Sequence, residues 1–272
     1  MVSISYGKPW DEKSTPLRIF GYRDDKFVEL EYTLDKPLEE GPWYGATFAD
    51  YDRDGLVDIY LIKYRGFEDY VGAEEFFDGV GDDNRLLRNR GGLKFQDVTA
   101  AVALQEQRPG FTLAASFTDF DRDGWPDLYV TNDFGANKLY RNYGGLNFVD
   151  ESKKRGVEGW GNGMGATWVD YDNDQDLDLY VSNIYSYAGK RILESSKSKN
   201  ITLKYKWAED FVSGNSLFEN DGNGVFSSVA KDKGVDNGLW AWGHLFFDPD
   251  FDGDLDLMVL NGFISNKREK DT

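Results

Sequence analysis

Short runs of alternating apolar and polar residues recur along the 272-residue chain, in pairs on either side of an acidic segment. They are rich in aromatic and branched side chains, which favour β-strands, and alternate residues of a strand point to opposite faces of its sheet. Each acidic segment is therefore predicted to connect two strands. The predicted strands lie at residues 46–49, 115–118, 166–169 and 245–247 before the acidic segments, and at residues 59–62, 128–131, 179–182 and 257–260 after them.

A second unit recurs after these strand pairs. It begins with asparagine, passes through an Asn/Gly-rich turn and ends with phenylalanine eleven residues later, at residues 84–95, 137–148 and 215–226. Two apolar runs joined by such a turn predict a β-hairpin. A further hairpin with a shorter turn is predicted at the N-terminus, over residues 17–32.

One repeat therefore consists of strand, acidic loop, strand, connection and hairpin, which makes four antiparallel strands. Four-stranded repeats of this length are typical of β-propeller blades. We predict an all-β fold in one domain over residues 1–272, a β-propeller of four-stranded antiparallel blades with four repeat units. Two arrangements stay open: the N-terminal hairpin completes the last blade and closes the ring, or the four units are a segment of a larger propeller.

Insertions lengthen two of the repeats at the same point, between the second and third strands, at about residues 63–83 and 184–214. In an antiparallel meander, successive connections alternate between the two ends of the strands. The acidic loops and hairpin turns are therefore expected at one end of the sheets, and both insertions at the other.

The four acidic loops, at residues 50–58, 119–127, 170–178 and 248–256, have aspartate at positions 1, 3, 5 and 9. Ca²⁺ takes six to eight oxygen ligands, and a nine-residue loop supplies them if it turns sharply. Glycine at position 6 permits that turn in every loop except the third, where Gln175 stands instead. We predict up to four Ca²⁺ ions, with these side-chain ligands: Asp50, Asp52, Asp54, Asp58, Asp119, Asp121, Asp123, Asp127, Asp170, Asp172, Asp174, Asp178, Asp248, Asp250, Asp252 and Asp256.

An EF-hand is a poor alternative for these loops, because its calcium site needs a bidentate glutamate at position 12. Position 12 holds an aliphatic residue in every loop, namely Leu61, Val130, Val181 and Val259. Gln175 is expected to adopt a positive φ at a cost of about 1–2 kcal/mol, which metal binding would offset.

The segments at residues 117–130 and 137–142 resemble the FG-GAP/VCBS repeat of integrin α-subunit propellers. The resemblance is stronger to bacterial repeat proteins that carry an ASPIC/UnbV domain and to cartilage-acidic-protein-like repeat proteins, whose last repeat resembles residues 240–247 with 261–264. It covers about residues 40–265, and it implies a calcium-binding β-propeller, commonly of seven blades. It also implies that position 7 of each loop supplies a backbone carbonyl: Leu56, Trp125, Asp176 and Asp254.

Part of the net charge of −18 comes from predicted metal ligands, because sixteen of the 49 acidic residues stand at ligand positions. Four bound Ca²⁺ would leave a net charge of about −10, which still argues against general binding to nucleic acids or anionic membranes.

No run of about 18 apolar residues exists, so no membrane span is expected. Cysteine is absent, and His244 is the only histidine, expected to be packed in a strand. Zinc sites and cysteine nucleophiles are thereby excluded.

We expect a binding module, stabilised by structural calcium, that takes a protein or glycan ligand at the end opposite the acidic loops. The alternative is an enzyme acting on polysaccharides or natural products, with its site at the central opening of the propeller. No catalytic residue is assigned from the sequence. Calcium loops of the extracellular type bind in the 10⁻⁴–10⁻³ M range, which favours an extracellular or periplasmic protein, although no signal peptide is evident.

Overall fold

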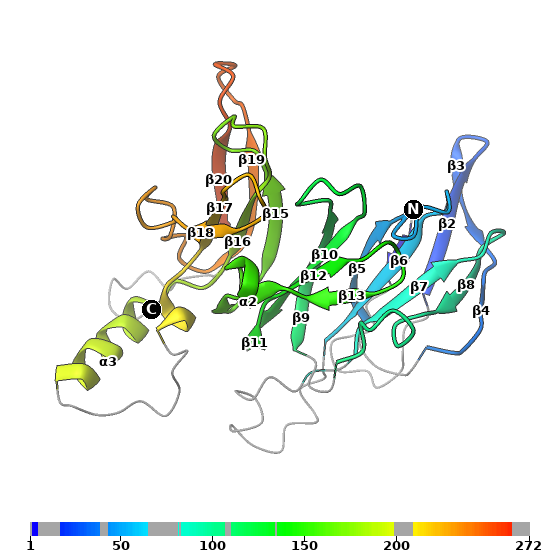
Figure 1. The fold of residues 1–272 in the computed structure, drawn as a ribbon, viewed down its shortest axis with the longest axis horizontal. Helices are drawn as coiled ribbons and strands as arrows, with labels where there is room; N and C mark the ends of the chain where they lie inside the picture. The colour runs from blue at the N-terminus through cyan, green and yellow to red at the C-terminus, as the bar shows by residue number, and fades with distance from the viewer. Residues whose placement is uncertain are drawn as a thin grey trace. The chain divides into compact units, whose positions relative to one another are not determined.

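The structure is a computed structural model, and it describes residues 2–4, 17–38, 43–64, 81, 83–106, 110–133, 135–198 and 209–262. The chain divides into two compact units. The first comprises residues 1–128 and 140–149, and the second comprises residues 129–139 and 150–272. Both consist mainly of antiparallel β-sheet (Figure 1).

In the first unit, one sheet has the strand order β4-β8-β7-β6-β5 and another has the order β1-β2-β3. All neighbours are antiparallel except the short β4, which runs parallel to β8. The strands are β1 (Val2–Ile4), β2 (Leu17–Arg23), β3 (Lys26–Leu30), β4 (Thr33–Leu34), β5 (Trp43–Ala49), β6 (Asp58–Lys63), β7 (Arg85–Asn89) and β8 (Lys94–Asp97).

A second four-stranded sheet, in the order β13-β12-β10-β9, takes residues from both units. The second unit holds the sheet β15-β16-β17-β18 and the pairs β11-β14 and β19-β20. The strands are β9 (Phe111–Thr118), β10 (Asp127–Asp133), β11 (Gly135–Ala136), β12 (Lys138–Asn142), β13 (Phe148–Asp150), β14 (Trp160–Gly161), β15 (Gly165–Val169), β16 (Asp178–Ser182), β17 (Ser216–Asn220), β18 (Phe226–Ser228), β19 (Ala241–Phe247) and β20 (Asp256–Asn261).

These strands confirm the predicted repeat. Each acidic loop joins two antiparallel strands, and three of the four strand pairs continue into a hairpin, which completes a four-stranded sheet. The N-terminal hairpin is also present, as β2 and β3. The central strands β6, β10 and β16 are buried along their whole length, because sheet and neighbouring elements cover both of their faces.

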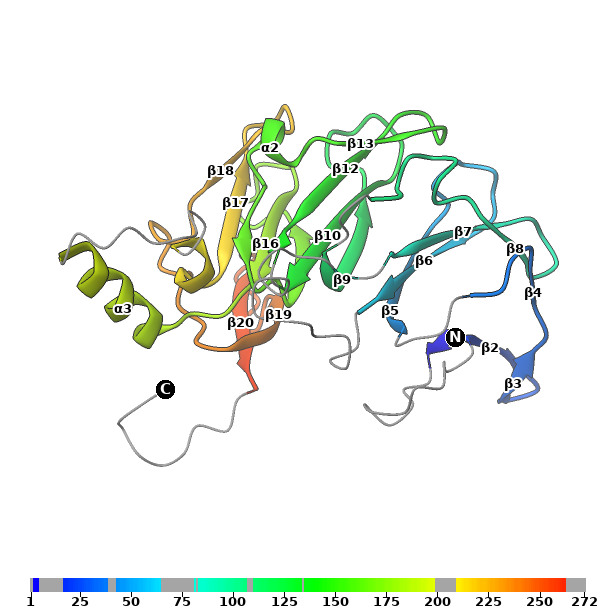
Figure 2. The same cartoon turned by 90° about the horizontal axis from the view of Figure 1, so that it is seen from below.

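The long insertion at residues 184–214 holds structure that the sequence did not predict. It contains the helix α3 (Tyr187–Ser198) and the 3₁₀ helix η3 (Asp210–Val212), and α3 lies to the side of the β15–β18 sheet next to η3 (Figure 2). A shorter helix, α2 (Ser152–Arg155), follows β13. Most of the other insertion (residues 65–80 and 82) and residues 199–208 lie outside the described residues.

Sheets stack through aromatic pairs that recur from repeat to repeat. The tyrosine in the second strand of one repeat meets an aromatic ring in the first strand of the next. In the first unit, the ring centroids of Tyr60 and Phe117 are 6.3 Å apart. In the second unit, Tyr129 and Trp168 are 6.0 Å apart and Tyr180 and Phe246 are 5.6 Å apart, all three pairs in the edge-to-face geometry that aromatic rings prefer.

Each unit also has an apolar cluster between sheets. In the first unit, buried residues of β2, β5, β6, β7 and β8 form one cluster, which includes Leu17, Ile59 and Phe95. In the second unit, Tyr180 and Leu217 pack against side chains of β19 and β20 such as Phe246. Face-to-face stacking of four-stranded antiparallel sheets is the arrangement of β-propeller blades. Closure into a ring and the number of blades stay predictions.

Candidate metal centres

Each acidic loop gathers three aspartates whose carboxylate oxygens lie within 4.8 Å of one another. In the first three loops the three come from positions 1, 3 and 9, and in the fourth loop they come from positions 1, 3 and 5. The groups are Asp50, Asp52 and Asp58; Asp119, Asp121 and Asp127; Asp170, Asp172 and Asp178; and Asp248, Asp250 and Asp252. Carboxylate oxygens at this spacing suit a hard cation such as Ca²⁺.

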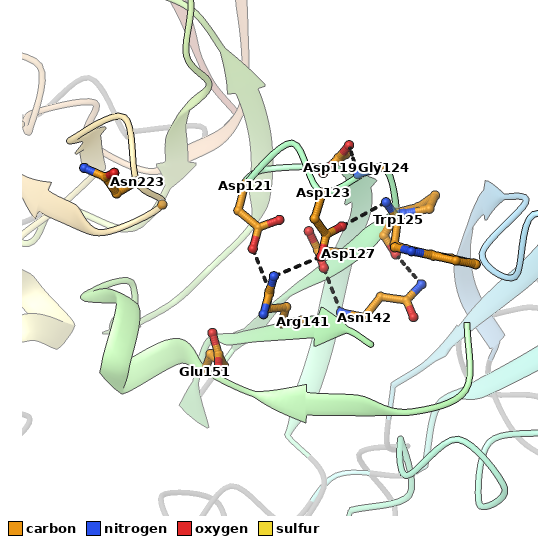
Figure 3. A network of polar contacts seen from close by, with 12 residues as sticks. Asp119, Asp121, Asp123, Gly124, Trp125, Asp127, Arg141, Asn142, Glu151 and Asn223 are labelled. Atoms are coloured by element: carbon orange, nitrogen blue, oxygen red, sulfur yellow. Dashed lines mark hydrogen bonds and ion pairs between the residues drawn. The ribbon is translucent and has the colours of Figure 1, made fainter. Parts of the chain in front are cut away.

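The aspartate at position 1 closes each loop by accepting hydrogen bonds from the backbone. In the second loop, Asp119 accepts the N–H of Gly124 at 2.9 Å, and Asp123 accepts the N–H of Trp125 at 3.0 Å (Figure 3). Asp50, Asp170 and Asp248 accept the N–H of position 6 in the same way. The spacing of the aspartates therefore folds the loop as well as supplying oxygen atoms.

Two residues of every loop have a positive φ. At position 6, φ lies between 75° and 93°. Gln175, which occupies this position in the third loop, has φ of 75°, and a positive value was expected from the sequence. Position 4 also has a positive φ, of 56° to 63°, although it is never glycine. The sequence did not predict this second turn; the residues concerned are Arg53, Arg122, Asn173 and Phe251.

The aspartate at position 9 is buried in the first three loops, with exposed fractions of 0% for Asp58, 0% for Asp127 and 1% for Asp178. Each accepts the backbone N–H of the asparagine that ends the third strand of its sheet, at 2.7–2.8 Å. The amide side chain of that asparagine donates to the carbonyl oxygen of position 8, at 3.0–3.1 Å. The asparagines, which we call the clamp asparagines, are Asn89, Asn142 and Asn220.

The first asparagine of each hairpin bonds to the second strand at the end of the sheet away from the acidic loop. Its Oδ1 atom accepts a backbone N–H at the end of the second strand, at 2.9–3.0 Å. The pairs are Asn84 with Lys63, Asn137 with Asn132, and Asn215 with Asn183. Both asparagines of the hairpin motif thus have structural roles that the sequence analysis, which used them only to mark the hairpin and its turn, did not predict.

Several buried carboxylate oxygens of the first three loops have no hydrogen-bond partner in the described part of the chain: Asp52 Oδ1, Asp119 Oδ1 and Asp170 Oδ1. A buried oxygen with no partner costs free energy, and a carboxylate costs more than a neutral group. These atoms could be ligands of a cation, and the donor set fits Ca²⁺.

Burial raises the pKa of the position 9 carboxyls in the metal-free protein. Desolvation raises the pKa of Asp58 to about 6, that of Asp127 to about 8 and that of Asp178 to about 7, although backbone N–H donors oppose the shift. Neighbouring aspartates add to it. A positive charge at the centre of the loop would reverse this effect, because it favours the ionised form.

The fourth loop departs from the expected equivalence of the four sites. Asp256 at position 9 is exposed and is not part of the group formed by Asp248, Asp250 and Asp252. The physical reason is that β20 has only β19 as a neighbour in the described part of the chain, so no clamp asparagine reaches Asp256. In the other loops it is position 5 that lies outside the group of three, namely Asp54, Asp123 and Asp174.

A pocket of about 430 Å³ lies in the second unit, at the end of the β15–β18 sheet that carries the insertion. Its lining is mostly polar and comes from α3, η3, β17, β18 and the segments next to them, including Lys190, Glu194, Asp210, Ser216 and Lys231. The acidic loop of the same sheet is at the opposite end of β17, next to Asn220. Within this sheet, the predicted separation of insertion and acidic loop is confirmed.

His244 is packed in β19, with its ring centroid 4.7 Å from that of Tyr180. Neither ring nitrogen has a hydrogen-bond partner, and burial lowers the pKa of the imidazole to about 4. His244 is therefore neutral at pH 7 and lies among apolar side chains, as expected of a packed strand residue.

The sheets and loops define an all-β protein built from repeats in which an acidic loop joins the first two strands. Residues 119–181 match the family model of the FG-GAP-like repeat, so this part of the chain is similar to an FG-GAP repeat. In the described part of the chain, no helix has the length and apolar character needed to cross a membrane.

Two known proteins are similar to this chain. Cartilage acidic protein 1 of Homo sapiens is 27% identical over an alignment of 192 positions, and the match covers 65% of this chain. The chain spans only 26% of the length of that relative. A solved structure of an Agrocybe aegerita lectin, described as specifically recognising non-reducing terminal N-acetylglucosamine, has 18% identity and a TM-score of 0.40, and the match covers 79% of this chain and 46% of the lectin.

Proposed function

We propose that this chain is a calcium-stabilised binding module, in which the acidic loops hold Ca²⁺ and the insertion-bearing end of the sheets binds a ligand. The observation that carries the calcium assignment is the set of buried carboxylate oxygens without a partner among the described residues, such as Asp119 Oδ1. Positions 1, 3 and 9 of the first three loops would contact the ion, together with position 5 and the carbonyl of position 7. A bound Ca²⁺ supplies the positive charge that allows these carboxylates to be ionised side by side.

Isothermal titration with Ca²⁺ tests this assignment on the purified chain. We expect at least three bound ions with dissociation constants of about 10⁻⁴–10⁻³ M. Asp127→Asn removes one carboxylate charge from the second loop and should abolish one binding event, whereas Asp232→Asn, a control on the exposed surface outside every loop, should abolish none. Absence of any calcium binding by the unmodified chain would contradict the assignment.

We place the ligand in the pocket beside α3 and assign it to carbohydrates. A volume of about 430 Å³ suits a small molecule, and this pocket differs from most ligand sites in its polar lining. Lysine, carboxylate, amide and hydroxyl groups offer the paired donors and acceptors that sugar hydroxyls require. Lys190 is held over the ring of Tyr185, with Nζ 3.8 Å from the centroid, so one of these donors is already oriented.

Saturation-transfer NMR against a panel of neutral and acidic mono- and disaccharides tests the carbohydrate assignment. A binding sugar should lose its signal with Lys231→Ala combined with Glu194→Ala, which removes groups on two sides of the pocket. Lys153→Ala in α2, outside the pocket, is the matched control. If no sugar shows transfer while a protein ligand binds and both variants reduce that binding, the carbohydrate assignment is wrong.

An enzyme is the second candidate, because the pocket contains a carboxyl whose pKa is raised above its usual value. Burial, with the neighbouring charge of Glu209 adding to it, raises the pKa of Asp210, and a general acid must hold its proton near the working pH. Hydrolysis of nitrophenyl glycosides that is lost in Asp210→Asn but kept in Lys153→Ala would favour this candidate. Binding of a sugar without turnover would favour the binding module.

We also propose an extracellular or periplasmic location. Loops that bind Ca²⁺ in the 10⁻⁴–10⁻³ M range are filled only where free calcium is high. Dissociation constants below about 10⁻⁶ M in the titration would remove this support.

A further inference from the structure

The residue before the clamp asparagine differs in charge between the repeats. It is Arg88 in β7, Arg141 in β12 and Glu219 in β17. All three stand at equivalent positions beside an acidic loop, because each clamp asparagine bonds to position 9 of that loop.

The two arginines each join positions 3 and 5 of their loop. Arg141 Nε lies 2.6 Å from Asp121 Oδ2 and its Nη2 lies 2.9 Å from Asp123 Oδ2 (Figure 3). Arg88 makes the same pair of contacts in the first loop, at 2.5 Å to Asp52 and 3.0 Å to Asp54. A guanidinium group stays charged at any relevant pH and fits two carboxylates at once.

Among the described residues, no arginine makes these contacts with the third loop. Glu219 accepts a hydrogen bond from the Tyr171 hydroxyl and pairs with Lys233 at 3.4 Å. No lysine or arginine pairs with Asp172 or Asp174 among the described residues. Residues 170–178 contain five aspartates and no basic residue, whereas residues 50–58 and 119–127 each contain four aspartates and one arginine.

Like charges this close repel one another unless a cation lies between them. We propose that Arg88 and Arg141 hold the first two loops closed without a metal ion, and that residues 170–178 form the loop whose folding depends on Ca²⁺. The positive φ of Gln175 acts in the same direction, because at position 6 only the third loop has a non-glycine residue in this strained conformation. This inference rests on the proposed role of calcium.

The difference has a consequence for the pocket beside α3. The third loop joins β15 and β16, and Ser216 of β17 and Ser228 of β18 line the pocket at the other end of the same sheet. Calcium at this one loop therefore stabilises the sheet that carries the proposed ligand site.

Hydrogen–deuterium exchange of the full chain, measured with EGTA and with millimolar Ca²⁺, tests the inference loop by loop. Peptides that cover residues 170–178 should gain protection of about tenfold or more when Ca²⁺ is added. Peptides that cover residues 50–58 and 119–127 should be protected in EGTA already and change by less than about threefold. Equal gains in the second and third loops would overturn the inference while leaving the calcium assignment intact. No change in any loop, with no calcium bound, would overturn both.

Charge exchange between the loops provides the second test. Glu219→Arg should protect residues 170–178 in EGTA, and Arg141→Gln should make residues 119–127 depend on Ca²⁺. If Glu219→Arg does not fold, Glu219→Gln keeps the side-chain shape and should still reduce the calcium dependence of the third loop. Unchanged exchange in Arg141→Gln with EGTA would show that the arginine does not hold its loop, and would overturn the inference.

Discussion

Gln175 adopts a backbone conformation that glycine adopts at lower cost. Its φ is 75°, and its side chain is exposed. A non-glycine residue in this region raises the free energy of the folded state by about 1–2 kcal/mol. Glycine removes this strain, but it also increases the entropy of the unfolded chain, which offsets part of the stabilisation. We therefore expect Gln175→Gly to increase the free energy of unfolding by about 1 kcal/mol, as measured by denaturant titration in Ca²⁺.

The reciprocal change in the first loop is the matched control. Gly55 has φ of 86°, and no atom lies within 4 Å of the place that a Cβ atom would occupy, so Gly55→Gln introduces the strain without a clash. It should lower the free energy of unfolding by about the same amount. Equal stability of the two variants and the unmodified protein would contradict this account of position 6.

His244 makes the stability of the second unit depend on pH. Its pKa is lowered from the usual 6.5 to about 4 by burial. Between these values the unfolded chain binds a proton that the folded chain does not, so stability falls as the pH drops below 6.5. The loss should be about 2 kcal/mol at pH 5 relative to pH 7.5.

Replacement of the imidazole by an apolar ring isolates this contribution from the many carboxyl groups. His244→Phe should remove the part of the pH dependence that lies between pH 6.5 and pH 4, when denaturant melts of the two proteins are compared at each pH. Parallel pH profiles for the variant and the unmodified protein would refute the assignment.

At the scale of strands and loops, the clamp asparagines connect each hairpin to its acidic loop. Asn142 is fully buried, and its side chain donates to the carbonyls of Tyr51 and Pro126 and accepts the N–H of Gly145. Asn142→Ala leaves these buried groups without partners, which costs about 2–4 kcal/mol. Denaturant unfolding should show this loss, whereas Asn147→Ala, at an exposed position in the same hairpin turn, should change stability by less than about 0.5 kcal/mol. Similar values for both variants would contradict the role of the clamp.

The strands and the acidic loops could be predicted because their signals are local. Alternation identifies a strand, and four aspartates at fixed spacing identify a loop that closes on its own backbone. The clamp asparagines and Arg141 could not be predicted in the same way, since their partners lie on other segments and appear only when β12 pairs beside the second loop. The charge difference between Arg141 and Glu219 is visible in the sequence. Its effect on the acidic loops becomes clear only when the structure shows that the third strand of each sheet lies beside the loop.

The helix α3 and the fourth loop show two other limits of sequence reasoning. The polar composition of residues 187–198 concealed the helix within a basic insertion. The fourth loop has the full aspartate pattern, yet Asp256 is exposed, because its burial depends on a third strand rather than on the loop itself. The local sequence pattern therefore predicts which side chains are candidate metal ligands, and the pairing of strands in the sheet determines which of these side chains lie close together.

At the scale of the whole molecule, the concentration of negative charge is the main feature that a metal would change. The chain has a net charge of −18, and its acidic loops bring ionisable groups into clusters within 4.8 Å. Ions that bind only the folded state stabilise it by mass action, by about 2.7 kcal/mol per site at a hundredfold excess over the dissociation constant. Binding of Ca²⁺ to the first three loops should therefore stabilise the folded state by more than any single contact in the structure does.

The melting temperature in Ca²⁺ and in EGTA tests the central claim, that the acidic loops are calcium sites which hold the strands together. The purified chain should melt on the order of 10 °C higher in a saturating concentration of Ca²⁺ than in excess EGTA. Mg²⁺ at the same concentration should give a smaller rise, because it requires near-octahedral geometry and retains its water ligands. An identical melting temperature in Ca²⁺ and in EGTA would contradict the claim.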